Sequence, residues 1–294
     1  MPRASAPFPW PGNKGGLADW ILDTFPRHDT YVDVFGGSGA LLFEKTPAET
    51  EIYNDADADL VQFMTTLRDA PEELVERLQM VPYARELHRE WATDFFEGHR
   101  PSDQIEQAAR YYFIRRAQYG GEAAKKVGFR ATVSGRRNPA RQWKNSIQRL
   151  PQFARRLQGV RIECQDYASL LADVASDTQS TVVYCDPPYR DSTNRYQLQD
   201  AGDSETTPSQ SPVFDFDEFV ATIGTLAEIQ NGPRVIISTD IVPSGLNNLN
   251  RVTKGSNFSM NAVGGAKEAT EHLLTNFDPD SAPSHSENAS LTAF

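Results

Sequence analysis

A short turn, Asp186-Pro187-Pro188-Tyr189, places a carboxylate, two prolines and an aromatic ring directly after the apolar run from Thr181 to Cys185. The prolines remove two backbone N–H donors and stiffen the turn, so their carbonyls remain as acceptors beside the carboxylate. The Asp186 carboxylate and the Pro187 carbonyl can each accept one hydrogen of an NH2 group, while the Tyr189 ring stacks on the flat group that carries it. This raises electron density on the nitrogen and prepares for the positive charge that develops as it attacks. We therefore predict that Asp186, Pro187, Pro188 and Tyr189 form a catalytic site for the exocyclic amine of a nucleobase.

A glycine-rich turn, Gly36-Gly37-Ser38-Gly39, follows another apolar run, Thr30 to Phe35. No lysine follows the glycines as in a phosphate-binding P-loop, and Leu42 stands where a dinucleotide-binding fingerprint has its third glycine. What remains is a turn at which backbone can approach a ligand closely, although glycines at tight turns are at least as often structural.

Asp55 follows the short predicted strand Glu51 to Asn54, sixteen residues after Gly39. A carboxylate at that edge of a sheet can accept both hydroxyls of a ribose. It can equally cap the next helix, a role for which Asp57 is the better candidate.

The elements that must position these residues alternate between strand and helix, which is the start of a doubly wound α/β sheet. Strands are predicted at 30–35, 51–54, 160–164, 181–185 and 234–238, and helices at 40–45, 59–67 and 215–228. Between them, periodic stretches at 72–80, 105–118 and 145–157 predict a mostly helical region. We therefore expect a discontinuous sheet domain, 1–70 and 159–277, with an insert at 71–158. Residues 191–212 are predicted to be a mobile loop and 278–294 a disordered tail.

The charge of the chain is divided between the insert and the remainder. The formal net charge is -11, yet residues 107–161 hold 14 basic residues and one acid, Glu122, which leaves a net of -24 elsewhere. Arginines interleaved with aromatic rings suit phosphates and bases, so we expect the insert to bind a polyanion, with a solvated charged face as the alternative. The residues expected to contact nucleic acid are Arg115, Arg116, Lys125, Lys126, Arg130, Arg136, Arg137 and Lys144.

The acidic remainder, with 22 arginines and only seven lysines in the whole chain, suggests a source that lives in concentrated salt; an ordinary acidic protein is the alternative. We find no apolar run long enough to cross a membrane and no apolar block near Met1, so an intracellular protein is expected. Two cysteines and five histidines without ligand spacing predict neither a disulfide framework nor a metal site.

Five motifs, in this order, resemble the Dam-like (class alpha) DNA adenine N6-methyltransferases. They are Pro9-Trp10-Pro11-Gly12-Asn13-Lys14, Asp33 to Gly39, Asn54-Asp55-Ala56-Asp57, Asp186 to Tyr189, and Glu271 to Asn276 with Ser259-Met260-Asn261 before it. The resemblance implies a Rossmann-like sheet that uses S-adenosylmethionine, with an inserted, mostly helical target-recognition domain. It implies methyl transfer to N6 of an adenine flipped out of duplex DNA, without a metal. The cofactor would be held by Trp10, Lys14, Phe35, Gly37, Gly39, Asp55, Asp166 and Asp186.

Three other activities stay open at this point. An RNA adenine would fit the same pocket, and so would the amine of cytosine N4, although that chemistry more often has Ser in place of Asp186. A non-catalytic DNA-binding protein is the third, but it has no reason to retain Lys14, Asp55 and Asp186 together. The segment Ala117 to Glu122 matches the family's recognition segment poorly, so the recognition sequence stays open, as does a restriction, viral or housekeeping role. We expect the protein to act as a monomer in the cytoplasm.

Overall fold

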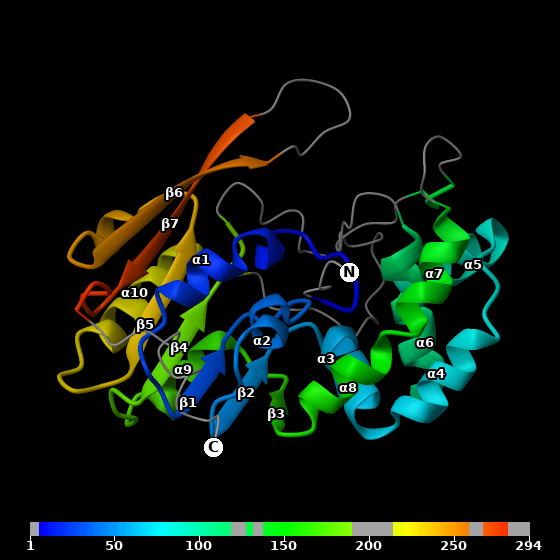
Figure 1. Cartoon of the computed structure of the whole chain (residues 1–294), viewed down its shortest axis with the longest axis horizontal. Coiled ribbons are helices and arrows are strands. Elements are labelled where there is room, and N and C mark those ends of the chain that lie inside the picture. Colours follow the sequence, from blue (N-terminus) through cyan, green and yellow to red (C-terminus); the bar gives the residue numbers. More distant parts are fainter. Residues whose placement is uncertain (1–5, 119–127, 132–137, 190–213, 259–266, 282–294) are drawn as a thin grey trace, which may run out of the picture.

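The sheet of this protein has seven strands in the order β3-β2-β1-β4-β5-β7-β6 (Figure 1). The computed structural model describes residues 6–118, 128–131, 138–189, 214–258 and 267–281. The strands are β1 (Thr30–Asp33), β2 (Thr50–Asn54), β3 (Val160–Glu163), β4 (Thr181–Cys185), β5 (Arg234–Thr239), β6 (Asn250–Phe258) and β7 (Lys267–Thr275). The first five are parallel, and β7 is antiparallel to both β5 and β6. The chain leaves β1 toward β2 and returns at β4 on its other side, so the switch point where such sheets bind ligands lies between β1 and β4.

Alternate residues of each strand face the two sides of the sheet, and both sides are covered by helices. Tyr31, Tyr53 and Tyr184 belong to one buried cluster, with α1 (Ala18–Asp23), α2 (Ala40–Glu44) and α3 (Ala58–Asp69). Val32 and Val183 belong to the other, with α9 (Tyr167–Val174) and α10 (Phe216–Ala227). This period of two explains why the strands read as continuous apolar runs, since both faces are buried. The predicted α/β fold class is confirmed.

Between α3 and β3 the described residues form five helices. They are α4 (Pro71–Gln79), α5 (Arg85–Phe96), α6 (Gln104–Ala117), α7 (Pro139–Ile147) and α8 (Leu150–Leu157), and α6 packs on α3, α4, α5 and α7. Their buried side chains join the cluster on the first face of the sheet: the ring of Phe63 in α3 stacks on Tyr112 in α6 at 5.4 Å between centroids. The expected division into sheet domain and insert stays a prediction, because the two share one core.

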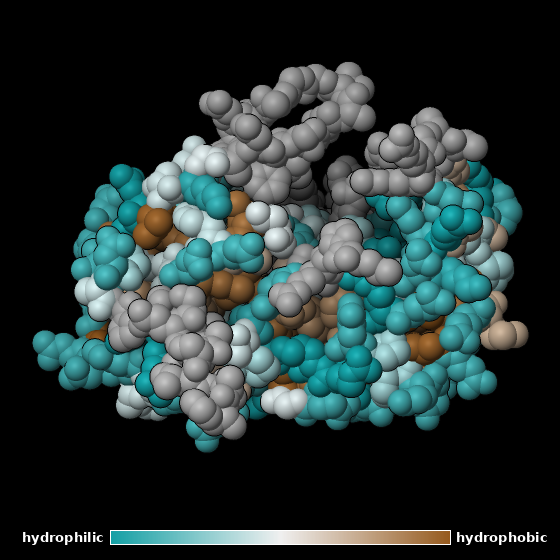
Figure 2. Space-filling model, viewed as in Figure 1, coloured by the Kyte–Doolittle hydropathy of each residue, from teal (hydrophilic) through white to brown (hydrophobic). Residues whose placement is uncertain are grey.

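The insert presents a hydrophilic surface on the side shown in Figure 2, with small, separate hydrophobic patches, as its arginine-rich sequence leads one to expect. Among the described residues, none of the helices has the length and apolar character to cross a membrane.

Two helices, α5 and α9, were not predicted, and one predicted helix is split. The helix predicted at 145–157 is two helices, because Pro151 lies in the first turn of α8, where its missing N–H costs nothing. α5 was not predicted because charged residues interrupt its apolar pattern. Its buried residues, His88, Trp91, Ala92 and Phe95, nevertheless lie at helical spacing. The expected loop 191–212 lies outside the described residues, and so does the predicted tail beyond residue 281.

Candidate active site

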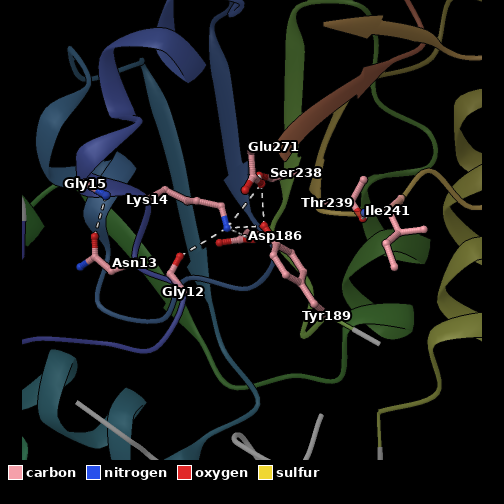
Figure 3. Close-up of polar contacts among 10 residues, drawn as sticks. All are labelled: Gly12, Asn13, Lys14, Gly15, Asp186, Tyr189, Ser238, Thr239, Ile241 and Glu271. Carbon is pink, nitrogen blue, oxygen red and sulfur yellow. Dashed lines mark hydrogen bonds and ion pairs between the residues drawn. The ribbon is translucent and has the colours of Figure 1, made fainter. Parts of the chain in front are cut away.

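Lys14 lies at the centre of a group of polar side chains beside the carboxyl end of β4 (Figure 3). Its Nζ is 2.8 Å from Oδ1 of Asp186 and donates a hydrogen bond of 2.5 Å to the Tyr189 hydroxyl. The lysine is 5% exposed, so this cation is held inside the protein by its partners. The structure thus brings Lys14 against the turn of Asp186 and Tyr189, which lies far from it in the sequence.

Asn13 fixes the loop that carries Lys14. Its side-chain oxygen accepts from the Gly15 N–H and caps the short 3-10 helix η1 (Lys14–Gly16), while its Nδ2 donates to Ser38 Oγ at 2.9 Å. Because Ser38 lies in the glycine turn after β1, this one amide joins the lysine loop to that turn.

Burial raises the pKa of Asp186 from 3.8 to about 6; the Lys14 ammonium opposes this rise and the Glu271 carboxylate adds to it. The Tyr189 hydroxyl donates to Glu271 Oε1 at 2.6 Å, and burial raises the pKa of this phenol, so it stays a protonated donor. At neutral pH the site therefore holds an ionised Asp186 beside the ring of Tyr189.

The glycines of the turn after β1 are required by packing and by backbone conformation. Gly37 and Gly39 have φ of +51° and +72°, values that a side chain rarely adopts, and a Cβ on Gly37 would lie 2.7 Å from Trp10 Nε1. Trp10 therefore packs against the backbone of this turn, so two predicted cofactor residues, Trp10 and Gly37, lie in contact.

Asp55 lies at the end of β2 and is tied to the same turn. Its Oδ2 accepts from the Gly37 N–H at 2.9 Å, and its Oδ1 accepts from the Asp57 N–H. Burial raises the pKa of Asp55 to about 6, with Asp57 adding to the rise. Asp57 itself caps α3, accepting from the N–H groups of Asp59 and Leu60, which confirms it as the capping residue.

The remaining predicted cofactor residues lie further out along the same edge. Phe35 packs on Tyr167 and Phe219 between β1 and the helices of the second face. Asp166 is exposed and caps α9 by accepting from the Ala168 N–H. A role for Asp166 toward a ligand stays a prediction.

Sequence reasoning gave no role of their own to four residues that build this edge. Asp33, 3% exposed at the end of β1, has its pKa raised to about 7 by burial, with Asp186 and Asp55 adding to the rise. The Asn54 amide donates to the Val34 and Gln165 carbonyls and so joins the ends of β1, β2 and β3. The other two are Glu271 of β7, which contacts Tyr189 and Lys14, and Ser238 of β5, whose hydroxyl donates to Glu271. A signal for Glu271 existed: it shares a strand face with Leu273 and Thr275, both buried.

The residues expected to contact nucleic acid fall into three groups. Arg115 is 2% exposed, with its guanidinium over the rings of Trp10 and Tyr111, which does not fit the expected surface contact. Arg116 and Arg130 line one cleft with Gln142, and Lys144 is exposed on α7. The other four, Lys125, Lys126, Arg136 and Arg137, lie outside the described residues.

Comparisons with known proteins agree with this architecture. Residues 10–213 match the family described as D12 class N6 adenine-specific DNA methyltransferase. A Type II methyltransferase of Lactococcus lactis, M1.LlaDCHI, is 27% identical over 61% of this chain and 64% of its own length. The DNA adenine methylase of Vibrio cholerae is 26% identical over 75% of this chain and 78% of its own. The chain thus spans less than two-thirds of the length of the Lactococcus enzyme.

Among solved structures, a conserved hypothetical protein of Streptococcus pyogenes is similar over 89% of this chain and 93% of its own, with a TM-score of 0.35 and 12% identity. That score is too low to carry an argument, and the fold rests on the strand order alone. The family match spans both the glycine turn and the Asp186 turn, which confirms the resemblance drawn from the motifs: the chain belongs to the D12 class of N6 adenine-specific DNA methyltransferases.

Proposed function

We propose that this protein transfers the methyl group of S-adenosylmethionine to N6 of an adenine flipped out of duplex DNA. The observation that carries the proposal is the Asp186 carboxylate, held by Lys14 at 2.8 Å at the switch point of the sheet and next to the Tyr189 ring. The family membership supports the same reaction.

The amine of the adenine would donate one hydrogen to Asp186 and the other to the Pro187 carbonyl, with Pro188 stiffening the turn. Lys14 binds Oδ1 of Asp186, and Oδ2 would accept from the substrate. A carboxylate whose pKa is raised to about 6 is a stronger acceptor than an exposed one and is still ionised at pH 7. These acceptors oppose the delocalisation of the nitrogen lone pair and stabilise the charge that develops during attack.

The residues at the ends of the neighbouring strands fit S-adenosylmethionine by their charge. Asp33, Asp55 and Asp186 end three adjacent strands, and each of the outer two raises the pKa of Asp33. Such a cluster suits a ligand with a sulfonium and an ammonium group, because a cation relieves the repulsion between the carboxylates. Asp55 would accept the ribose hydroxyls, and Trp10, Phe35 and the turn at Gly37 and Gly39 would enclose the ligand. When bound, the cofactor supplies an electrophilic methyl group.

The DNA would lie against the insert, since its exposed cations gather there. Arg116 and Arg130 line a small surface cleft with Gln142 and Tyr83, a combination of guanidinium, amide and ring that can contact phosphate or a base edge. Because an adenine within a duplex cannot reach Asp186, it must leave the stack and rest on Tyr189. We infer that the protein acts as a monomer in the cytoplasm of a prokaryotic or virus-infected cell.

Methyl transfer from labelled S-adenosylmethionine to duplex DNA, single-stranded DNA and RNA tests the proposal. The expected result is label in duplex DNA at adenine N6, and loss of the label in Asp186→Ala. Asp173→Ala, which removes an exposed aspartate from α9, is the matched control and should keep full activity. Label in RNA alone, or in cytosine, would assign a different substrate. An Asp186→Ala protein that methylates at the wild-type rate would contradict the proposed role of Asp186.

A further inference from the structure

Glu271 is a buried carboxylate that enters the site from β7, the antiparallel strand. It is 6% exposed, and the motif logic gave it no role of its own. The free-energy cost of burying a carboxylate must be offset by hydrogen bonds or by an opposite charge, so the partners of Glu271 indicate its role.

All the contacts described for Glu271 converge on one oxygen. Oε1 accepts from the Tyr189 hydroxyl at 2.6 Å and from Ser238 Oγ at 2.5 Å, and it lies 3.6 Å from Lys14 Nζ (Figure 3). Ser238 is fully buried at the end of β5, so it anchors the carboxylate to the centre of the sheet. The phenol of Tyr189 is thereby held at its far end by two charged groups, the glutamate and the lysine.

Lys14 is shared between two carboxylates. Its Nζ is nearer to Asp186, at 2.8 Å, than to Glu271. Because Glu271 also attracts the lysine, Lys14 neutralises less of the charge of Asp186 than it would if Asp186 were its sole partner. The groups that act on Asp186 are Lys14 from the N-terminal loop, Glu271 from β7 and Tyr189 from its own turn. Tyr184 of β4 and Asp33 of β1 act on it as well.

We propose that Glu271 is the positioning residue of the methyl-transfer site. Anchored by Ser238, it fixes the Tyr189 ring for stacking and draws part of the Lys14 charge away from Asp186. The inference rests on the proposed function, since it assigns to Glu271 a task within that same site. Glu271 touches neither adenine nor the methyl group in this scheme, and it acts through Tyr189 and Lys14.

Two substitutions separate the hydrogen bonds from the charge. Glu271→Gln keeps an acceptor oxygen for the Tyr189 and Ser238 hydroxyls but removes the negative charge. Glu271→Ala removes both. Glu228→Gln, at an exposed acid following α10, is the matched control for the loss of one carboxylate.

The first readout is base extrusion, followed with 2-aminopurine in place of the target adenine in a duplex whose site has been mapped with the wild-type protein. Its fluorescence rises when it leaves the stack. Glu271→Gln and Glu228→Gln should give the wild-type signal. Glu271→Ala should lower the equilibrium constant for extrusion about tenfold, since a lost hydrogen bond to a charged group is worth about 1.5 kcal/mol or more.

The second readout is the pH profile of single-turnover methylation. In Glu271→Gln the acid limb should move to lower pH, because the acid that raises the pKa of Asp186 is gone, and the DNA KM should not change. A wild-type acid limb in Glu271→Gln, or wild-type extrusion in Glu271→Ala, overturns the inference. A wild-type protein that methylates no duplex DNA overturns the proposed function instead, so the two failures are distinct.

Discussion

Replacing Lys14 by methionine should move the pH dependence of the reaction in the opposite direction to Glu271→Gln. The substitution keeps a long apolar stem in a site that is 5% exposed and removes the cation that lies 2.8 Å from Asp186. Removing one partner of a buried pair costs about 3–5 kcal/mol, because it leaves the other charge uncompensated. Lys14 lowers the pKa of Asp186, so its loss must raise that pKa above about 6.

The size of the effect follows from the same numbers. The Asp186 side chain is 20% exposed, so solvent still screens it and the lower end of the range applies. About 3 kcal/mol corresponds to roughly two pH units, since one unit is worth about 1.4 kcal/mol. At pH 7 the ionised fraction of Asp186 would fall from about nine-tenths to about one-tenth, which slows the reaction roughly tenfold. At pH 9 the variant should recover most of its rate.

Single-turnover methylation at saturating S-adenosylmethionine, from pH 5 to pH 9.5, measures this shift. Lys14→Arg should retain an acid limb near that of the wild type, because it keeps the charge. Arg27→Met, which removes an exposed cation just before β1 at the opposite end of the sheet, should change nothing. The reasoning is refuted if Lys14→Met loses activity equally at every pH, since the lysine would then act by geometry or cofactor affinity alone.

Three further expectations follow. Asn13→Ala should lower the free energy of unfolding by about 1 kcal/mol and weaken the affinity for S-adenosylmethionine, because it removes a helix cap and the hydrogen bond to Ser38. Scanning and titration calorimetry measure the two values. Wild-type cofactor affinity in a folded variant would contradict a role of this hydrogen bond in cofactor binding. Arg116→Ala should reduce the slope of log affinity for DNA against log salt by about one, whereas Arg115→Ala should lower the melting temperature and leave that slope unchanged. Unfolding measured against KCl tests adaptation to salt, and equal stability at low and molar salt removes that hypothesis.

Two of the proposed site residues could be placed from the sequence because each follows an apolar run directly. Asp186 and Asp55 stand within one residue of a strand, and strand ends define one edge of a parallel sheet. Glu271 could not be found in this way, since it lies 82 residues from Tyr189 and faces it only because β7 runs antiparallel between β5 and β6. The role of the glycines was also hidden, because Trp10 approaches Gly37 through the tertiary fold.

The sequence counts all 14 basic residues between 107 and 161 toward a nucleic-acid surface. Among the described residues, at least four of them contact other parts of the protein. Arg110 pairs with Glu106 and Asp94, Arg156 with Glu51, and Arg161 with Glu163, while Arg115 is buried. Arg156 and Lys45 share the buried Glu51 and thereby fasten α8 to β2, so part of the positive charge holds the insert to the sheet. Under the proposed function, at most ten of these 14 cations would be available for DNA, which would limit the phosphates that this segment can neutralise and leave more of its discrimination to base edges.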